Sequence, residues 1–224
     1  MSYIKRFIAI LPESAQEEMK RIYFKYQIRN QKFGTPEPEY LELDKYVRDG
    51  DWVIDVGANV GHYTMKLSNL VGANGRVIAF EPVSTTFCHL TNNAQLATHK
   101  NITLINAAVS ESSKLVGMSI PRFATGLSNY YQASIDSGDD DSDTFVLTIS
   151  VDSLRLSNTI RFIKVDAEGH EPAVLRGLRN VINRDKPILV LETVTDEIRG
   201  DLIKVGYVES RLEGSPNTIF KAMN

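Results

Sequence analysis

Short runs of apolar residues alternate along this chain with longer stretches whose apolar positions recur every three or four residues. The apolar runs lie at residues 52–56, 76–80, 102–105, 162–165 and 188–191. The periodic stretches predict helices over 61–71 and 83–96, a helix through Val174, Leu175 and Leu178, and a helix over 196–205. Short apolar strands separated by helices are typical of a mostly parallel sheet with helices on both faces. The pattern therefore predicts a doubly wound, Rossmann-like α/β fold.

Both ends of the chain add to this alternation. Near the N-terminus, four apolar residues recur at helical intervals, and Ser14 and Glu17 have the spacing of a capping box, which predicts a helix. The four are Met19, Ile22, Tyr23 and Tyr26. A break at 34–36 separates this helix from a second helical piece over 41–47, which ends at Gly50. At the other end, residues 207–212 and 218–221 predict a hairpin that closes the sheet with an antiparallel C-terminal strand.

An insertion at about residues 115–150 interrupts the alternation. A connection of this length is either a disordered surface loop or a part of the functional site. Its acidic run at 136–143 is typical of a solvated loop tip, and it lacks the Gly and Glu positions of a calcium-binding loop. Small, polar and aromatic residues at 126–131 are suited to a sugar or polyketide surface, so we predict that the segment 121–131 forms part of an acceptor pocket.

Composition and charge exclude several classes of protein. The 224 residues hold 25 Lys and Arg against 28 Asp and Glu, for a formal net charge of −3. A mildly acidic chain has no global footprint for nucleic acid or for an anionic membrane. Cys88 is the single cysteine, so the chain forms no internal disulfide and no cysteine-rich zinc site. The apolar run at 7–11 is too short for a signal sequence or a membrane span, so we expect a soluble, cytoplasmic protein.

The strongest chemical motif is the segment Asp55-Val56-Gly57-Ala58-Asn59-Val60-Gly61, which follows the first apolar strand and opens a helix. Small residues allow the backbone to turn sharply and to approach a ligand, and the N-terminus of a helix offers free N–H groups. Glu81 ends the second strand, 20 residues after Gly61. That spacing fits an acid that accepts hydrogen bonds from the two hydroxyl groups of a ribose.

The same residues separate two kinds of nucleotide ligand. A dinucleotide fingerprint needs a middle glycine for approach to the pyrophosphate, and Asn59 stands in its place. The Asp55 carboxylate would repel a pyrophosphate and would suit a cationic or zwitterionic ligand. S-adenosylmethionine, which has a ribose, an amino-acid portion and a sulfonium but no phosphate, fits better than NAD. A glycine turn with no nucleotide at all is the remaining alternative.

Three motifs together resemble the FkbM-type methyltransferases. They are DVGANVGHYT at 55–64, AFEP at 79–82 and FIKVDAEGHE at 162–171. The similarity continues through VLRG at 174–177 and the segment 187–192, and it also takes in EPE at 37–39 and VDSL at 151–154. It covers about residues 36–195. The resemblance implies a class I methyltransferase domain, which we place over 51–224, and we expect the N-terminal helical segment, residues 1–50, to pack over the cofactor site.

The resemblance also implies roles for individual residues. Those assigned to the cofactor are Glu37, Asp55, Gly57, Ala58, Asn59, Gly61, Tyr63, Thr64, Glu81, Pro82, Asn106, Ala107 and Ala108. Ordinary helix packing is the alternative for Tyr63 and Thr64, a turn asparagine for Asn106, and a favoured helix start for Glu37.

The catalytic residues implied are Asp166, Glu168 and His170. If the first and fourth strands are neighbours, Asp166 faces the methyl group. Asp166, helped by Glu168 or His170, would then remove the proton of the acceptor. We assign no metal ligand, because no third carboxylate stands at an obvious spacing. A divalent metal such as Mg²⁺ is the less favoured route.

The function implied is S-adenosylmethionine-dependent O-methylation of a hydroxyl group on a sugar or natural product. The expected partner is a small hydroxylated acceptor, without nucleic acid or membrane, and the expected state is a monomer or a homodimer. Methylation of nitrogen is a first alternative, although Asp166-Ala167-Glu168-Gly169 replaces the Asn-Pro-Pro-Tyr-type motif of many amine methylases. A non-catalytic nucleotide-binding module and an NAD oxidoreductase are the others.

Overall fold

The computed structural model describes residues 11–121, 133–135 and 144–223. Its central sheet has seven strands in the order β10-β11-β9-β8-β1-β2-β3. Their bounds are β1 Trp52–Val56, β2 Arg76–Phe80, β3 Ile102–Ile105, β8 Ile160–Val165, β9 Ile188–Leu191, β10 Tyr207–Ser210 and β11 Thr218–Ala222. The helices between and before them are α2 Glu13–Arg29, α3 Pro38–Leu41, η1 Leu43–Lys45, α4 His62–Val71, α5 Ser84–Ala94, α6 Glu171–Gly177, α7 Arg179–Asp185 and α8 Asp196–Lys204.

The sheet confirms the predicted doubly wound topology. β1 lies in the interior of the sheet and pairs in parallel with β2 on one side and with β8 on the other. The strand order therefore switches at β1, because β2 and β3 follow on one side of it and β8 and β9 on the other. The predicted hairpin is present, since β10 and β11 pair antiparallel. Its last strand is inserted between β9 and β10 rather than at the edge.

Successive residues of the strands point to opposite faces of the sheet and pack into two separate hydrophobic cores. Val53, Val77 and Phe162 face α4 and the N-terminal pieces α3 and η1. Ile54, Ile163 and their neighbours face α6, α7 and α8 on the opposite side. Because both faces are covered, the strands read as near-continuous apolar runs, which is why the sequence pattern predicted them well.

The helical stretches are more broken than their periodicity predicted. The piece over 41–47 is a single turn, α3, followed by the short 3₁₀ helix η1. The stretch through Val174 and Leu178 is two helices, α6 and α7, that meet at Leu178.

The predicted N-terminal helix exists as α2, but its apolar stripe does not pack on the core. Met19, Ile22, Tyr23 and Tyr26 are all exposed. The predicted capping box is wrong as well, because the residue before the helix is Pro12 and no side chain caps it. Glu17 instead contacts Lys20 and His89. None of the described helices is both long enough and apolar enough to cross a membrane.

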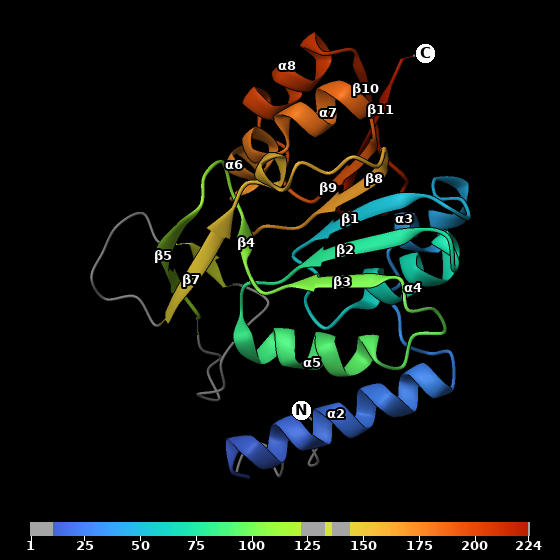
Figure 1. The fold of residues 1–224 in the computed structure, drawn as a ribbon, viewed down its shortest axis with the longest axis vertical. Helices are drawn as coiled ribbons and strands as arrows, with labels where there is room; N and C mark the ends of the chain where they lie inside the picture. The colour runs from blue at the N-terminus through green and yellow to red at the C-terminus, as the bar shows by residue number, and fades with distance from the viewer. Residues whose placement is uncertain (1–10, 122–132, 136–143, 224) are drawn as a thin grey trace.

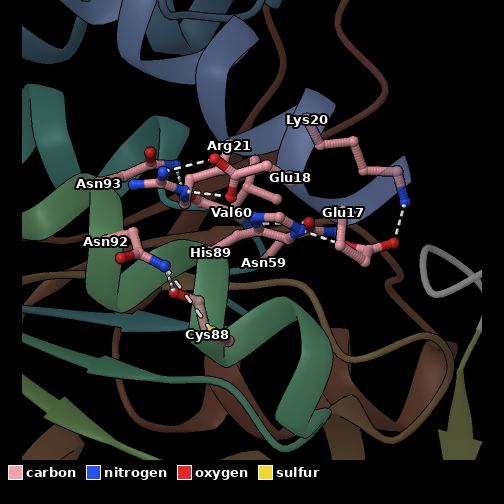
Figure 2. A network of polar contacts seen from close by, with 10 residues as sticks. All are labelled: Glu17, Glu18, Lys20, Arg21, Asn59, Val60, Cys88, His89, Asn92 and Asn93. Carbon is pink, nitrogen blue, oxygen red and sulfur yellow. Dashed lines mark hydrogen bonds and ion pairs between the residues drawn. The ribbon is translucent and has the colours of Figure 1, made fainter. Parts of the chain in front are cut away.

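Helix α2 forms an outer layer over α5 (Figure 1). Figure 2 shows the contact, in which Glu17 of α2 reaches the buried ring of His89 on α5. One turn further along α5, Asn93 donates a hydrogen bond of 2.8 Å from Nδ2 to the backbone oxygen of Val60. Through α5, the N-terminal helix is thus connected to the glycine-containing turn that follows β1.

The insertion builds a second, four-stranded sheet with the order β4-β7-β5-β6. Its strands are β4 Ala108–Val109, β5 Lys114–Ser119, β6 Ser134–Ile135 and β7 Thr144–Ile149. A surface loop is therefore not the right description of its described part. The predicted acceptor segment 121–131 and the acidic run 136–143 lie outside the described residues, apart from Pro121.

Candidate functional site

A cavity of about 280 Å³ opens where β1, β2, β8 and β9 end. This is the edge of a doubly wound sheet at which ligands bind, next to the point where the strand order reverses. Among the residues predicted for the site, those that line the cavity are Gly57, Asn59, Glu81, Pro82, Ala107, Ala108, Asp166, Glu168 and His170. The structure therefore brings together the glycine turn, the end of β2 and the segment after β8.

Gly57 makes the closest backbone approach in the site. Its φ is +73°, and a Cβ atom built on it would lie 1.8 Å from the backbone oxygen of Asp166. The backbone N–H of Asp166 donates to the oxygen of Val56 at 3.1 Å. Only glycine permits the turn after β1 and the end of β8 to touch in this way.

Two residues other than glycine adopt the left-handed conformation at this cavity. Asn59 has a φ of 50° and Glu168 has a φ of 47°. Such backbone is uncommon outside glycine, and asparagine tolerates it better than most residues. The side chain of Asn59 accepts from its neighbour, Val60 N–H, at 2.8 Å. The strain lies beside the cavity, which is typical of functional sites.

Glu81 fixes the turn from the opposite wall. Its Oε2 accepts from the backbone N–H of Asn59 and its Oε1 from that of Val83, both at 2.9 Å. Burial raises the pKa of Glu81 to about 7, although these two N–H groups favour the ionised form. Each oxygen keeps a further lone pair, so this cavity-lining carboxylate can also accept from a ligand.

Asp55 lies beneath the cavity rather than in its wall. It is buried, and its Oδ2 accepts from the hydroxyl of Thr64 at 2.6 Å. Burial raises the pKa of Asp55 to about 6, against the opposing effects of Thr64 and Lys164. Thr64 is therefore engaged inside the protein in this structure.

The buried Tyr63 and the half-buried Glu37 belong to a separate polar cluster. The hydroxyl of Tyr63 donates to Oε2 of Glu37 at 2.5 Å and lies 3.2 Å from Oε1 of Glu39. Ser215 and Asn217 also contact Glu39. The cluster ties the N-terminal segment to α4 and to the C-terminal hairpin. Neither Glu37 nor Tyr63 lines the cavity.

The remaining residues predicted to bind the cofactor also divide into those that line the cavity and those that do not. Asn106 donates from Nδ2 to the backbone oxygens of Glu81 and Pro82, at 2.8 and 3.0 Å. It therefore holds the ends of β2 and β3 together, while the adjacent Ala107 and Ala108 line the cavity. Ala58 is buried and Gly61 precedes α4, and neither is part of the wall.

Asp166 is surrounded by groups that favour its ionised form. Its Oδ2 lies 3.1 Å from Nζ of Lys164, whose side chain is almost fully buried. Burial opposes ionisation, but Lys164 and a hydrogen bond with Glu192 outweigh it and lower the pKa of Asp166. Glu192 shows the reverse, because the same hydrogen bond, burial and the charge of Asp166 raise its pKa to about 8.

Glu168 and His170 complete the catalytic candidates. Burial and the nearby carboxylates raise the pKa of Glu168. Burial lowers the pKa of His170, so its ring is neutral near pH 7. One ring nitrogen, Nε2, lies 3.0 Å from the hydroxyl of Ser110.

Sequence reasoning missed several residues of the wall. Glu192 is the most important, because Asp166, Glu168 and Glu192 each offer an oxygen within 4.8 Å of the others. The third carboxylate, which the spacing did not reveal, is thus present. Lys164 already places an ammonium group against this cluster. The other missed residues are apolar and include Val83, Met118, Ala133 and Ile135, from the start of α5 and from the small sheet.

Comparison with known proteins gives a family match and one curated relative. A family model described as the methyltransferase FkbM domain matches residues 55–208. A hexuronic acid methyltransferase of Haloferax volcanii, AglP, is 30% identical over 145 residues, which cover 63% of this chain and 56% of that protein.

Solved structures show the same fold. Methyltransferase FkbM from Methylobacillus flagellatus aligns with a TM-score of 0.56 and 17% identity, over 96% of this chain and 57% of that chain. Fibrillarin from Aeropyrum pernix, solved with natively bound S-adenosyl-L-methionine, aligns with a TM-score of 0.50 and 13% identity, over 79% and 68%. The fold is that of the class I methyltransferases. The chain spans little more than half the length of AglP and of the Methylobacillus protein.

Proposed function

This chain belongs to the FkbM methyltransferase family, and on that premise we propose that it is an enzyme that transfers a methyl group from S-adenosylmethionine to a hydroxyl group of a neutral sugar or a related neutral small molecule. The observation that carries the proposal is one cavity at the switch point of the sheet. It combines the Gly57 turn, the carboxylate of Glu81 and the ionised carboxylate of Asp166.

The residues present fit the cofactor. The Gly57 turn is a cradle that a Cβ atom would fill, and Glu81 offers buried lone pairs to a ribose. When bound, S-adenosylmethionine supplies a methyl group on a positively charged sulfur, which leaves as a neutral thioether. Because no phosphate is involved, the acids beside the turn do not oppose this ligand.

Asp166 is our candidate for the group that receives the proton. A hydroxyl group holds its proton far more tightly than a carboxylic acid, so Asp166 cannot remove it in advance. It takes the proton late, as the oxygen–carbon bond forms and the carbon–sulfur bond breaks. Positive charge grows on the acceptor oxygen during this step, and an ionised carboxylate stabilises it. The low pKa of Asp166 keeps that carboxylate ionised.

The charges of the cavity favour a neutral acceptor over an anionic one. Glu81, Asp166, Glu168 and Glu192 line it, and no lysine or arginine among the described residues does so. Lys164 is buried against Asp166. A carboxylate on the acceptor would be repelled by these acids, which disfavours uronic acids.

A panel of methyl glycosides tests this function. The protein is incubated with S-adenosylmethionine and a neutral hexoside, an amino sugar or a uronic acid, and mass spectrometry detects the gain of one methyl group. We expect methylation of the neutral hexoside. Methylation of nitrogen on the amino sugar, or of the uronic acid alone, would contradict the acceptor class. Calorimetry with S-adenosylhomocysteine and NAD tests the cofactor, and binding of NAD alone would overturn the proposal.

Asp166→Asn tests the proton step. We expect turnover to fall by about 10²–10⁴-fold, the usual contribution of a positioned base, while affinity for S-adenosylhomocysteine is unchanged. Asp201→Asn, on the exposed side of α8, is the matched control. Full activity of Asp166→Asn would remove this residue from the mechanism. Loss of wild-type turnover on chelation, restored by Mg²⁺, would instead make Asp166 a metal ligand.

A further inference from the structure

Two carboxyl groups stand side by side at the ends of neighbouring parallel strands. Val165 of β8 is in register with Leu191 of β9, so Asp166 and Glu192 are the next pair along the ladder. The backbone N–H of Glu192 donates to the oxygen of Val165 at 3.2 Å, which extends the pairing beyond the strands. The backbone therefore fixes the two side chains next to each other, and both line the cavity.

One oxygen of this pair lacks a hydrogen-bond donor. Oε2 of Glu192 is buried and has no hydrogen-bond partner. Two carboxylates can only accept, whereas a protonated carboxylic acid can donate. A single proton on Glu192, shared with Asp166, satisfies the pair and removes the repulsion between two adjacent negative charges.

We propose that Glu192 is a positioning residue, a neutral carboxylic acid that donates a hydrogen bond to Asp166 and orients its carboxylate toward the acceptor hydroxyl. The inference rests on the proposed function, since it assigns Glu192 a task in methyl transfer. Lys164 holds Asp166 from the side of β8 at 3.1 Å, and Glu192 holds it from the side of β9. Held by two groups, the carboxylate keeps one orientation while the acceptor binds.

The charged groups around Glu192 determine at which pH it acts. Glu192 faces Asp166 at the end of β8 and Glu168 in the loop that follows β8. Both acids disfavour the ionisation of Glu192. Lys164 is the cation that favours ionisation. Asp55 of β1 is paired in register with Lys164 of β8, on the next strand of the sheet. The balance raises the pKa of Glu192 to about 8, so the proton is present at neutral pH and is lost in mildly alkaline solution.

Glu192→Gln and Glu192→Ala separate positioning from packing. A glutamine amide still donates to Asp166 but cannot ionise, whereas alanine cannot donate. At pH 7 we expect Glu192→Gln to keep turnover within about threefold of the wild type, and Glu192→Ala to lose about tenfold or more, the usual effect of losing a hydrogen bond to a charged group. Glu213→Gln, an exposed residue between β10 and β11, is the control. All variants are first shown to bind S-adenosylhomocysteine with wild-type affinity.

The pH profile of methyl transfer to the neutral hexoside is the decisive measurement. Wild-type turnover should fall above about pH 8, as Glu192 ionises, and this fall should be absent from Glu192→Gln. An unchanged alkaline fall in Glu192→Gln, or a Glu192→Gln variant as inactive as Glu192→Ala, would overturn the inference. Failure of the proposed function would look different, because the wild type itself would transfer no methyl group to any acceptor.

NMR tests the proton without an acceptor. In protein carrying ¹³C-labelled glutamate, the carboxyl signal absent from Glu192→Gln belongs to Glu192. We expect this signal to titrate with a midpoint near 8 in the wild type. In Asp166→Asn we expect a midpoint nearer the ordinary 4.5, because the charge of Asp166 is lost and Lys164 can pair with Glu192 instead. A wild-type midpoint near 4.5 would overturn the inference even if the enzyme is active.

Discussion

At the scale of single residues, Glu81 combines a structural task with the ligand-binding task that we propose for it. Its carboxylate holds the backbone of Asn59 and Val83, and it also lines the cavity. The sequence predicted this residue because its spacing from the glycine turn is that of a ribose-binding acid. Its tie to Asn59 was not predictable, since it depends on a contact across 22 residues that only the folded turn creates.

The first prediction concerns Glu81→Ala. Loss of two charge-assisted hydrogen bonds to a ribose costs on the order of 2–4 kcal/mol, so we expect affinity for S-adenosylhomocysteine to fall by tens- to hundreds-fold. Calorimetric titration measures it, and Glu213→Ala controls for the change of charge. Circular dichroism must show that the variant is folded. A folded Glu81→Ala protein with unchanged affinity would place the ribose elsewhere.

Glu192 shows what single-residue reasoning overlooked. It follows an apolar strand in the same way that Asp166 does, and a carboxylate at the end of each strand was visible in the sequence. What the sequence did not contain is the strand order, which makes β8 and β9 neighbours and brings the two side chains together. Lys164 was missed for a different reason. A lysine inside an apolar run interrupts the hydrophobic pattern, and the sequence does not show that its ammonium group is buried against Asp166.

At the scale of elements, prediction worked where periodicity was strong and failed where local chemistry competed. Strands buried on both faces stood out as apolar runs. Strand β7, residues Thr144–Ile149, alternates buried and exposed side chains, but it directly follows the acidic run and was not separated from it. In α2 the apolar period was real, yet the stripe is exposed, and the contact of α2 with α5 uses Glu17 and Phe24 against His89. Periodicity predicts a helix without saying which face packs.

The small sheet leads to a prediction about the acceptor. Met118 and Ile135 line the cavity from β5 and β6. Ile135→Ala removes apolar surface from this wall, so we expect the KM for the acceptor to rise several-fold while affinity for S-adenosylhomocysteine stays constant. The matched control is Leu147→Ala, which changes an exposed residue of the same sheet. Equal KM values for the two variants would place the acceptor outside this wall.

At the scale of the whole molecule, the site concentrates acids that the fold keeps out of water. Burial raises the pKa of Asp55 to about 6 and that of Glu81 to about 7. The hydrogen bond with Asp166, together with burial, raises the pKa of Glu192 to about 8. In the unfolded chain these groups ionise near 3.8 and 4.5. Over the interval between the two values the folded protein binds more protons, so stability falls as pH rises.

Two histidines act in the opposite direction. Burial lowers the pKa of His62 and of His170 below 6.5, so the unfolded state binds the extra proton and stability rises with pH up to that value. Above pH 6.5 this effect is complete and the raised carboxyl groups dominate. A protein without cofactor is thus expected to lose stability between about pH 6.5 and 8. The buried acids around the cavity are therefore expected to destabilise the folded protein in this pH interval.

Glu81→Gln isolates one part of this effect. Glutamine keeps the size of the side chain but does not titrate, so the stability of the wild type relative to the variant should fall as pH rises from 4.5 to 7. The expected change is on the order of 3 kcal/mol, from the rise of this nearly buried group's pKa from 4.5 to about 7. Urea unfolding of both proteins at pH 5 and pH 8 measures it, because groups common to both cancel in the difference. Glu213→Gln should show a difference that does not depend on pH. If the Glu81→Gln difference is also the same at both pH values, Glu81 ionises as readily in the folded protein as in the unfolded chain, and burial does not prepare this carboxylate for a ligand.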